Sequence, residues 1–264
     1  MLLELADYYL LIFLLPFIAL HFFWRARDYA APAGWKVRAT IVSGAIYGVS
    51  MAVGIGWGAV LPETSLVDGA ALGSWGGALV GILVYELAHY GYHRAAHSWN
   101  WLWRLGHQMH HSAESLDAFG ANYLHPIDAA LFTTWAVLVF YPLLGLTPEA
   151  GAIAAAFLAF NAAFQHANIR TPRWLGTIVQ RPESHAIHHG RGIHAYNYSD
   201  LPLWDMLFGT YRNPKAGDEP RTEGFYDGAS SRIGAMLTFH DVSAPPRVSA
   251  AKPRQGLQPG LGVR

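Results

Sequence analysis

Five apolar stretches, each nearly long enough to cross a lipid bilayer, constrain this chain more than any other feature. They occupy residues 8–24, 39–60, 70–90, 129–146 and 150–164. A spanning helix needs about 20 largely apolar residues, so the last two, separated by the turn around Pro148, form an expected hairpin that is short for a full crossing. With 52% hydrophobic and only 14% charged residues, the sequence predicts an all-α, multi-pass transmembrane helical bundle.

The basic residues predict how this bundle is oriented, because Lys and Arg prefer the cytoplasmic side of a membrane. If the N-terminus lies outside, all 18 Lys and Arg residues fall inside, and the first inner loop alone holds Arg25, Arg27, Lys36 and Arg38. The outer loops then carry only acidic charges: Glu4, Asp7, Glu63, Asp68 and Glu149. A soluble all-helical protein would not sort its charges by loop.

Eight histidines follow the third and fifth apolar stretches, and this orientation places all of them on the cytoplasmic side. They form three clusters: His93 and His97; His107, His110 and His111; and His185, His188 and His189. Residues three and four apart share one side of a helix, so each cluster presents its imidazoles together. Eight imidazoles are too many for one metal ion and suit two. The sequence therefore predicts a cytoplasmic helical cap that holds a histidine-rich dimetal site.

The residue types limit the identity of the metal without fixing it. Imidazole ligands suit iron, zinc, copper and nickel, whereas a structural zinc site needs only four ligands. Two irons fit best if the task is dioxygen activation, because zinc does not change its oxidation state. The chain has no cysteine, which excludes iron–sulfur clusters, thiolate zinc sites and a cysteine nucleophile.

Other polar residues near the clusters are candidates for the same site. At 100° per residue, Glu86 and His89 lie within roughly 80° of His93 and His97 on one helix face, and we expect both to support the ligands. His166 closes the fifth stretch and could be a ninth ligand, and His125 could be a ligand, a supporting residue or a substrate contact. The isolated histidines His21, His194 and His240 are interpreted as ordinary core or surface residues.

Several of these motifs resemble the fatty acid hydroxylase/sterol desaturase superfamily. The similar segments are residues 92–97, 107–112 and 185–189, followed by Asn197-Tyr198-Ser199, Leu203-Trp204-Asp205 and Phe208-Gly209-Thr210-Tyr211. The resemblance runs from about Val80 to Arg212. It implies a multi-pass helical enzyme in which the eight cluster histidines hold two iron ions (Fe²⁺/Fe³⁺), with no catalytic residue beyond the metal centre.

Two positions depart from the pattern of that superfamily. Glu86 stands where its members often have Asp, and Ser199 stands where they usually have Gly. Neither change removes an expected ligand, although Ser199 makes a tight backbone turn harder to form. Near the second departure, Asn197 and Asp205 are expected to orient ligand imidazoles, as polar neighbours of metal ligands commonly do.

The resulting functional hypothesis is a membrane-bound di-iron oxygenase of the monooxygenase type. It would hydroxylate or desaturate a lipid (fatty acyl, sterol-like or ether lipid) with dioxygen and two external electrons. The sequence has neither the cysteines for an iron–sulfur cluster nor a dinucleotide-binding glycine motif after a strand, so a separate electron-donor protein is expected. A net charge of zero argues against nucleic acid as a partner.

Two alternatives remain open: a non-enzymatic membrane protein that binds or transports metal, and a zinc-dependent lipid hydrolase. Ligands at the cytoplasmic rim count against a transporter, whose sites lie near the midplane, and eight histidines exceed what a zinc hydrolase needs. We expect N-terminal membrane segments over residues 1–70, a catalytic domain over 71–215 and a partly disordered extension over 216–264. The sequence leaves the lipid and the oligomeric state open.

Overall fold

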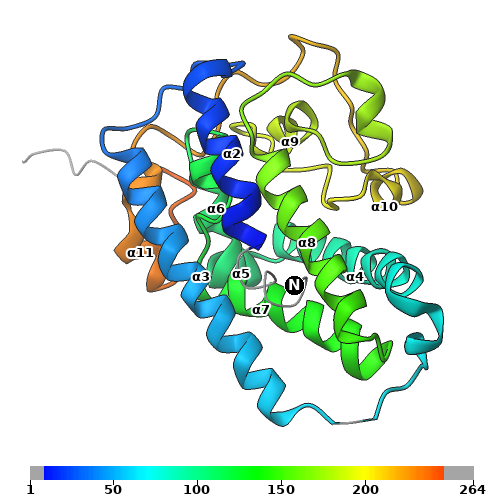
Figure 1. The fold of residues 1–264 in the computed structure, drawn as a ribbon. Helices are drawn as coiled ribbons and strands as arrows, with labels where there is room; N and C mark the ends of the chain where they lie inside the picture. Colours follow the sequence, from blue (N-terminus) through cyan, green and yellow to red (C-terminus); the bar gives the residue numbers. More distant parts are fainter. Residues whose placement is uncertain (1–8, 63, 247–264) are drawn as a thin grey trace, which may run out of the picture.

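The computed structural model describes residues 9–62 and 64–246, and within these ranges the chain is helical. These ranges contain no β-sheet and one isolated β-bridge, between Gly190 and Glu223. The expected all-α fold class is confirmed. Five long helices form the body of the molecule (Figure 1): α2 (Tyr9–Trp24), α3 (Trp35–Val60), α4 (Gly73–Ser98), α7 (Pro126–Leu138) and α8 (Pro148–Gln165).

Short helical elements lie in the connections between the long helices and in the segment that follows α8. Two of them, η2 and η4, are π-helical. In chain order the short elements are η1 (Gly69–Leu72), α5 (Asn100–Leu102), η2 (Trp103–His107), α6 (Gln108–His111), η3 (Ala118–Gly120), η4 (Val139–Leu143), η5 (Arg173–Thr177), α9 (Pro182–His189), α10 (Pro202–Leu207), η6 (Ala229–Ser231) and α11 (Ile233–Leu237).

Capping side chains and prolines set where α7 and α8 begin. The His125 ring at the start of α7 and the Thr147 hydroxyl at the start of α8 each accept a hydrogen bond from a nearby amide, both at 3.1 Å. A proline follows each cap, where its missing N–H costs no helical hydrogen bond. Pro148 therefore belongs to the first turn of α8, and the expected turn between the two apolar stretches ends one residue earlier.

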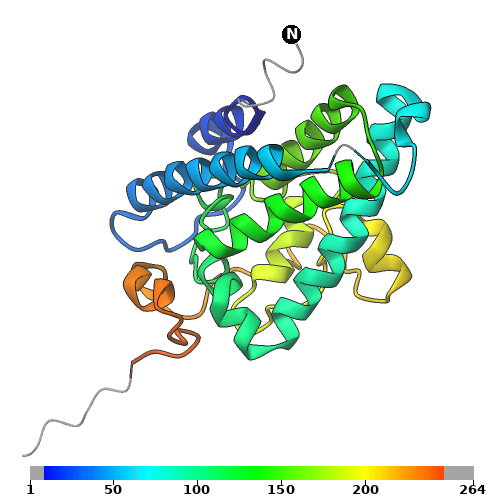
Figure 2. The same cartoon turned by 90° about the horizontal axis from the view of Figure 1, so that it is seen from below.

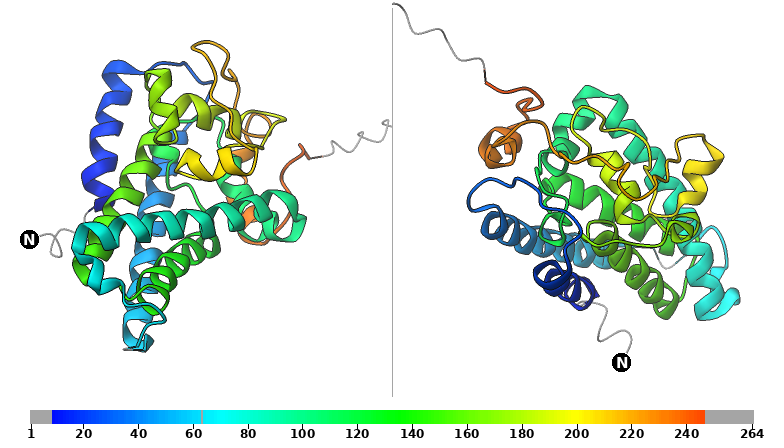
Figure 3. Two further views of the ribbon diagram at one scale, coloured as in Figure 1. Left: turned by 90° about the vertical axis from the view of Figure 1, so that its right-hand side faces the viewer. Right: turned by 90° about the horizontal axis from the view of Figure 1, so that it is seen from above.

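Small residues let the long helices approach closely. α8 lies between α2 and α4, while α3 packs along α7 (Figures 2 and 3). A Cβ on Gly77 of α4 would lie 3.1 Å from Ala150 Cβ, and one on Gly81 would lie 2.7 Å from Leu146 Cδ1. This contact buries an apolar core that includes Ala78, Ile82, Tyr85, Phe140 and Ala154.

Three helical stretches among the described residues are long and apolar enough to cross a membrane: Trp35–Val60, Gly69–Ser98 and Pro126–Leu143. They correspond to the second, third and fourth of the five expected stretches. The first stretch forms α2, whose apolar part Ile12–Trp24 is shorter, and the fifth forms α8, which is not among the three. α4 also continues past the expected boundary at residue 90, so His93 and His97 extend from a spanning helix.

The connections gather at two opposite ends of the bundle. At one end, the loop after α2 meets the segment after α8, because Ala26 N donates to Asn168 O at 2.8 Å and Asn168 Nδ2 donates to Arg27 O at 2.7 Å. At the other end, amides of residues 66, 67 and 69 donate to carbonyls of residues 142–144. The basic first inner loop therefore lies at the same end as the residues that follow α8.

Glycine at residue 69 is needed where the two chain segments meet at the second end. A Cβ there would overlap the carbonyl oxygen of Leu144, which is backbone and has little freedom to move. Gly69→Ala should lower the thermal midpoint of the detergent-solubilised protein by about 5 °C. Gly56→Ala is the matched control, since nothing lies within 4 Å of its Cβ position. An equal midpoint for both variants would contradict this account of the turn.

Candidate metal centre

Nine buried or half-buried histidines converge at the first end of the bundle in two separate groups. In each group, one ring nitrogen per residue lies within 4.8 Å of the corresponding nitrogens of all the others. The first group takes residues from α4, η2, α6 and α9, and contains His93, His97, His107, His111 and His188. The second contains His110, His166, His185 and His189.

All eight histidines of the three sequence clusters belong to these groups, and His166 is the ninth member. The clusters do not map onto the groups one to one. On α6, His110 joins the second group while His111 joins the first, and on α9 His188 and His189 divide in the same way. Successive residues of a helix point about 100° apart, so one short helix can serve two neighbouring sites.

The spacing of the ring nitrogens fits bound metal better than it fits hydrogen bonds. In the second group, Nε2 of His166 lies 3.1 Å from Nε2 of both His110 and His185, and Nε2 of His185 lies 3.1 Å from Nε2 of His189. Each neutral Nε2 carries either one proton or one lone pair, so the middle nitrogens of this chain cannot satisfy both of their contacts by hydrogen bonding. A metal–imidazole bond is about 2.1 Å long, which puts two nitrogens at right angles on one ion about 3.0 Å apart.

The first group leaves ring nitrogens without partners. Nε2 of His93, His97 and His188 is buried and has no hydrogen-bond partner among the described residues. An unsatisfied buried polar atom costs about 1–3 kcal/mol, so three such atoms in one place call for a ligand. A metal ion bound by these lone pairs would satisfy them together. The donor set in both groups therefore fits a metal cofactor.

In three histidines of the first group, an acceptor holds the opposite ring nitrogen, Nδ1, and so turns Nε2 toward the group. Nδ1 of His93 donates to Tyr198 O at 2.6 Å, and Nδ1 of His188 donates to Tyr196 O at 2.7 Å. Nδ1 of His107 donates to the Asp128 carboxylate at 2.9 Å. A partner at Nδ1 fixes the tautomer and leaves the Nε2 lone pair free for a metal.

Asn197 and Asp205 support the site through the backbone and not by contacting the imidazoles. The Asp205 carboxylate accepts hydrogen bonds from the amides of Tyr198 and Ser199 at 2.9 and 2.8 Å. Asn197 adopts φ 50°, and its amide group bonds to the backbone of Ser184 and Arg212. Together these contacts hold residues 196–199 in place, and the carbonyls of Tyr196 and Tyr198 in this segment accept hydrogen bonds from two of the histidines.

The two departures from the superfamily pattern contact each other. Glu86 is fully buried, and its Oε2 accepts a hydrogen bond from Ser199 Oγ at 2.8 Å and from the Asp200 amide at 2.9 Å. The serine hydroxyl thus supplies a donor that glycine would lack. Glu86, His89 and Asp200 form a third, smaller cluster beside the first histidine group.

Burial favours the unprotonated form of six grouped histidines that lie outside the spanning helices. Burial and repulsion from neighbouring imidazoles lower the pKa of His110, His111, His185, His188 and His189 well below its ordinary value. Burial lowers the pKa of His166 to about 4 and raises that of the Asp200 carboxyl to about 7. Neutral imidazole is the form that binds metal, so the site is prepared for it at neutral pH.

Sequence analysis missed two residues beside the site and left a third undecided. Asp128, the partner of His107, also accepts a hydrogen bond from Tyr92 at 2.5 Å; its signal is an acidic residue two positions after His125-Pro126. His194, interpreted as ordinary, has Nδ1 3.2 Å from Nδ1 of His111. His125 belongs to neither group, and its ring caps α7.

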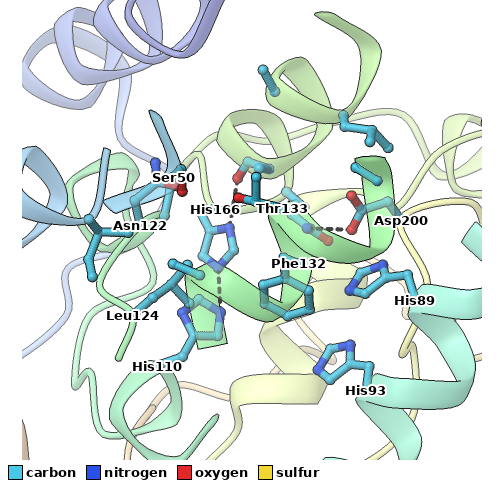
Figure 4. A pocket seen from close by; sticks show the side chains of 18 of the residues that line it. Ser50, His89, His93, His110, Asn122, Leu124, Phe132, Thr133, His166 and Asp200 are labelled. Carbon is cyan, nitrogen blue, oxygen red and sulfur yellow. Dashed lines mark hydrogen bonds between the residues drawn. The ribbon is translucent and has the colours of Figure 1, made fainter. Parts of the chain in front are cut away.

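A cavity of about 400 Å³ opens beside both histidine groups (Figure 4). Its walls come from α3, α4, α7 and α8 and include Ile46, Met51, Phe132, Ala136 and Leu158. His93 and His107 of the first group line it, as do His110, His166 and His185 of the second. An apolar chain inside this cavity would lie against both histidine groups.

The fold and the site together define a helical protein with three membrane-length helices and a histidine-rich centre able to hold metal. Residues 78–210 match the family model described as fatty acid hydroxylase, and the chain belongs to this family. No solved structure matches the chain.

Among curated proteins, human alkylglycerol monooxygenase is 34% identical over 146 residues, which is 52% of this chain and 30% of that protein. Sphinganine C4-monooxygenase 1 from Arabidopsis thaliana is 28% identical over 49% of this chain and 52% of its own length. Ornithine lipid hydroxylase OlsE from Rhizobium tropici is 31% identical over 52% and 42%, respectively. The matched region therefore spans about a third to a half of these relatives.

The Asp128–His107 hydrogen bond should tune metal affinity. Asp128→Asn keeps the size of the side chain but removes the charged acceptor, so we expect metal affinity to fall about 10–100-fold. Titration of metal into metal-free protein, followed by elemental analysis, measures this change. Asp227→Asn is the control, because Asp227 is exposed and pairs only with Arg191 at the surface. Equal affinities for both variants would remove Asp128 from the site.

The metal-free protein should lose stability as the pH falls. Burial lowers the pKa of both His166 and His194 to about 4, whereas an unfolded histidine titrates near 6.5. Between these values the unfolded chain binds more protons, so the free energy of unfolding decreases from about pH 6.5 down to pH 4. Thermal unfolding across this range tests the effect.

The control for this pH dependence is His194→Asn, which suits the positive φ of 42° at that position. This variant should show a shallower loss of stability with acid, because one buried imidazole with a lowered pKa is gone. A midpoint independent of pH in the parent protein would contradict the burial argument.

Proposed function

We propose that this protein is a membrane-bound oxygenase that hydroxylates or desaturates a lipid at a centre of two iron ions. The observation that carries the proposal is the position of an apolar cavity between membrane-length helices and against both histidine groups. A lipid chain is the substrate type that reaches such a cavity from the bilayer. The relatives named for alkylglycerol, sphinganine and ornithine lipid support the same substrate class.

The two histidine groups would each hold one iron. His93, His97, His107, His111 and His188 would hold one ion, and His110, His166, His185 and His189 the other. When bound, the pair of irons would supply the redox chemistry with dioxygen that amino-acid side chains lack. Glu86, His89, Asn197 and Asp205 would keep the ligand-bearing segments in place.

The protein's own part in the reaction is to bind the chain, orient it and keep water out. Phe132 and Leu158 line the cavity and can hold methylene groups by apolar contact. Five ligand histidines border the same cavity, so one carbon of the chain would be presented to the metal centre. Lining residues include no Lys or Arg, which favours an uncharged section of the lipid inside and leaves any charged headgroup outside.

The charge distribution supports a cytoplasmic position for the centre, with the N-terminus outside. The described Lys and Arg residues all lie in segments that the sequence assigns to the inner side; among them, Lys36 and Arg38 belong to the first turn of α3, and Arg94 to the end of α4. Asp68 and Glu149 belong to the opposite end. Residues 71–215 would form the catalytic domain. Electrons would come from a separate donor protein, because the chain has no cysteine for an iron–sulfur cluster.

Replacing one ligand should separate this proposal from its alternatives. His110→Ala removes a member of the second group, so we expect bound iron to fall from about two ions per chain toward one and lipid-dependent oxygen uptake to fall to background. His240→Gln is the control, since His240 is exposed and belongs to neither histidine group. The measurements are iron content after loading and oxygen consumption with a lipid extract and a reductant.

Two outcomes would overturn the oxygenase assignment. One is a single zinc ion per chain together with lipid hydrolysis that proceeds without oxygen. The other is metal binding that is unaffected by His110→Ala, with unchanged oxygen uptake.

A further inference from the structure

A second cavity, of about 410 Å³, lies at the same end of the bundle as the metal centre but shares no lining residue with the cavity described above. The end of α2, the loop after it and the first turn of α3 form most of its wall. Ser115, Asp117 and Asn168 complete the lining. Nothing in the proposed oxygenase reaction uses this cavity.

Three cationic side chains line the second cavity: Arg25, Arg27 and Lys36. They come from the first inner loop, which sequence analysis identified as basic. The Lys36 ammonium lies over the ring of Phe22, 4.6 Å from its centroid, and 5.6 Å from that of Phe119. These aromatic contacts hold the ammonium at the cavity, and no carboxylate of the described residues forms an ion pair with it.

The start of α3 adds a second source of positive potential. This helix runs for 26 residues, and no side chain caps its first turn. Gly34, Trp35, Lys36 and Val37 all line the cavity. The Trp35 amide already donates to Pro32 O at 3.0 Å, which leaves the amides of Lys36 and Val37 for a ligand. Uncapped first-turn amides and the helix dipole together favour an anion at this position.

Two buried nitrogens at the cavity lack partners among the described residues. His21 is only 6% exposed, and its Nδ1 forms no hydrogen bond. Arg27 uses Nε on Glu219 at 3.2 Å and Nη1 on Tyr29 at 3.4 Å, but its Nη2 is buried and unpaired. Burying such donors without acceptors is costly, and a ligand with several acceptor oxygens would satisfy both.

The acidic residues at the cavity do not serve as acceptors for these nitrogens or for Lys36. The buried Asp117 carboxylate is occupied by Trp35 Nε1 at 3.0 Å and by the amides of Phe119 and Gly120, as well as by the Ser115 hydroxyl. Asp28 is 83% exposed and pairs with Arg25 at the surface. Lys36, Arg27 Nη2 and the start of α3 therefore remain available to an external anion.

The surroundings of the cavity indicate where the anion comes from. The last three residues of α2 are Phe22, Phe23 and Trp24, which are 55%, 87% and 74% exposed. Exposed aromatic residues at the end of an apolar helix are typical of the headgroup level of a bilayer. We propose that this cavity binds the phosphate group of a membrane phospholipid. Its oxygens accept hydrogen bonds from guanidinium, ammonium and backbone amides.

Binding of a short-chain lipid tests this site separately from catalysis. The probe is dioctanoyl phosphatidic acid, titrated by calorimetry into the full-length protein in a non-ionic detergent. The variant Arg25→Gln/Lys36→Gln removes two exposed charges and should weaken binding at least about tenfold. The matched control, Arg173→Gln/Lys215→Gln, removes two exposed charges outside the cavity and should bind like the parent protein.

A third variant tests the geometry without altering formal charge. His21→Phe preserves the ring and its packing between Phe22 and Phe119 but removes the unpaired nitrogen, so it should also weaken binding. Thermal unfolding of each variant verifies that the fold is retained.

Several results would overturn the proposal. They are absence of saturable binding, equal weakening in the control variant, and binding of dioctanoylglycerol as tight as that of phosphatidic acid. Inorganic phosphate tests the lipid source of the anion. If it binds as tightly as phosphatidic acid, the cavity is a site for free phosphate and the lipid assignment fails.

Discussion

Nine imidazoles packed together in two neighbouring groups are the constraint on which the rest of this structure depends. Neutral rings at this density repel little but leave lone pairs facing one another, as the 3.1 Å contacts between Nε2 atoms show. Where Nδ1 donates to an acceptor, the lone pair on Nε2 of the same ring faces the group. A metal ion is the one partner that satisfies all these nitrogens at once, so metal binding and the folding of this end of the bundle are expected to be coupled.

Much of the chain around the centre serves to hold acceptors in place. The segment from Tyr196 to Ser199 presents carbonyls to two histidines. Hydrogen bonds of the Asp205 and Asn197 side chains hold this segment in place. Glu86 then ties the same segment to the spanning helix α4. The Glu86 carboxylate thus joins the spanning helix to this segment, as the hydrogen bond from His93 to Tyr198 O also does. Its own hydrogen bonds offset the cost of burying it beside an apolar core.

Local sequence patterns determined what could be predicted and what could not. Apolar runs predicted the helical bundle, and three- and four-residue spacings predicted that the clustered histidines would converge. The division into groups of five and four depends on how α6 and α9 dock together, which no local pattern encodes. For the same reason Asp128 and the contact between Glu86 and Ser199 could not be foreseen, since each joins residues far apart in the chain. The weaker fifth stretch became α8, which packs inside the bundle between α2 and α4.

The division of neighbouring histidines between the two groups has a consequence for assembly. α6 and α9 each carry ligands of both groups on adjacent residues, so neither helix can move for one ion without moving for the other. Filling one site would pre-order the rings of its neighbour and lower the entropic cost of the second binding event. If each group holds one ion, as proposed, the two ions would then bind cooperatively.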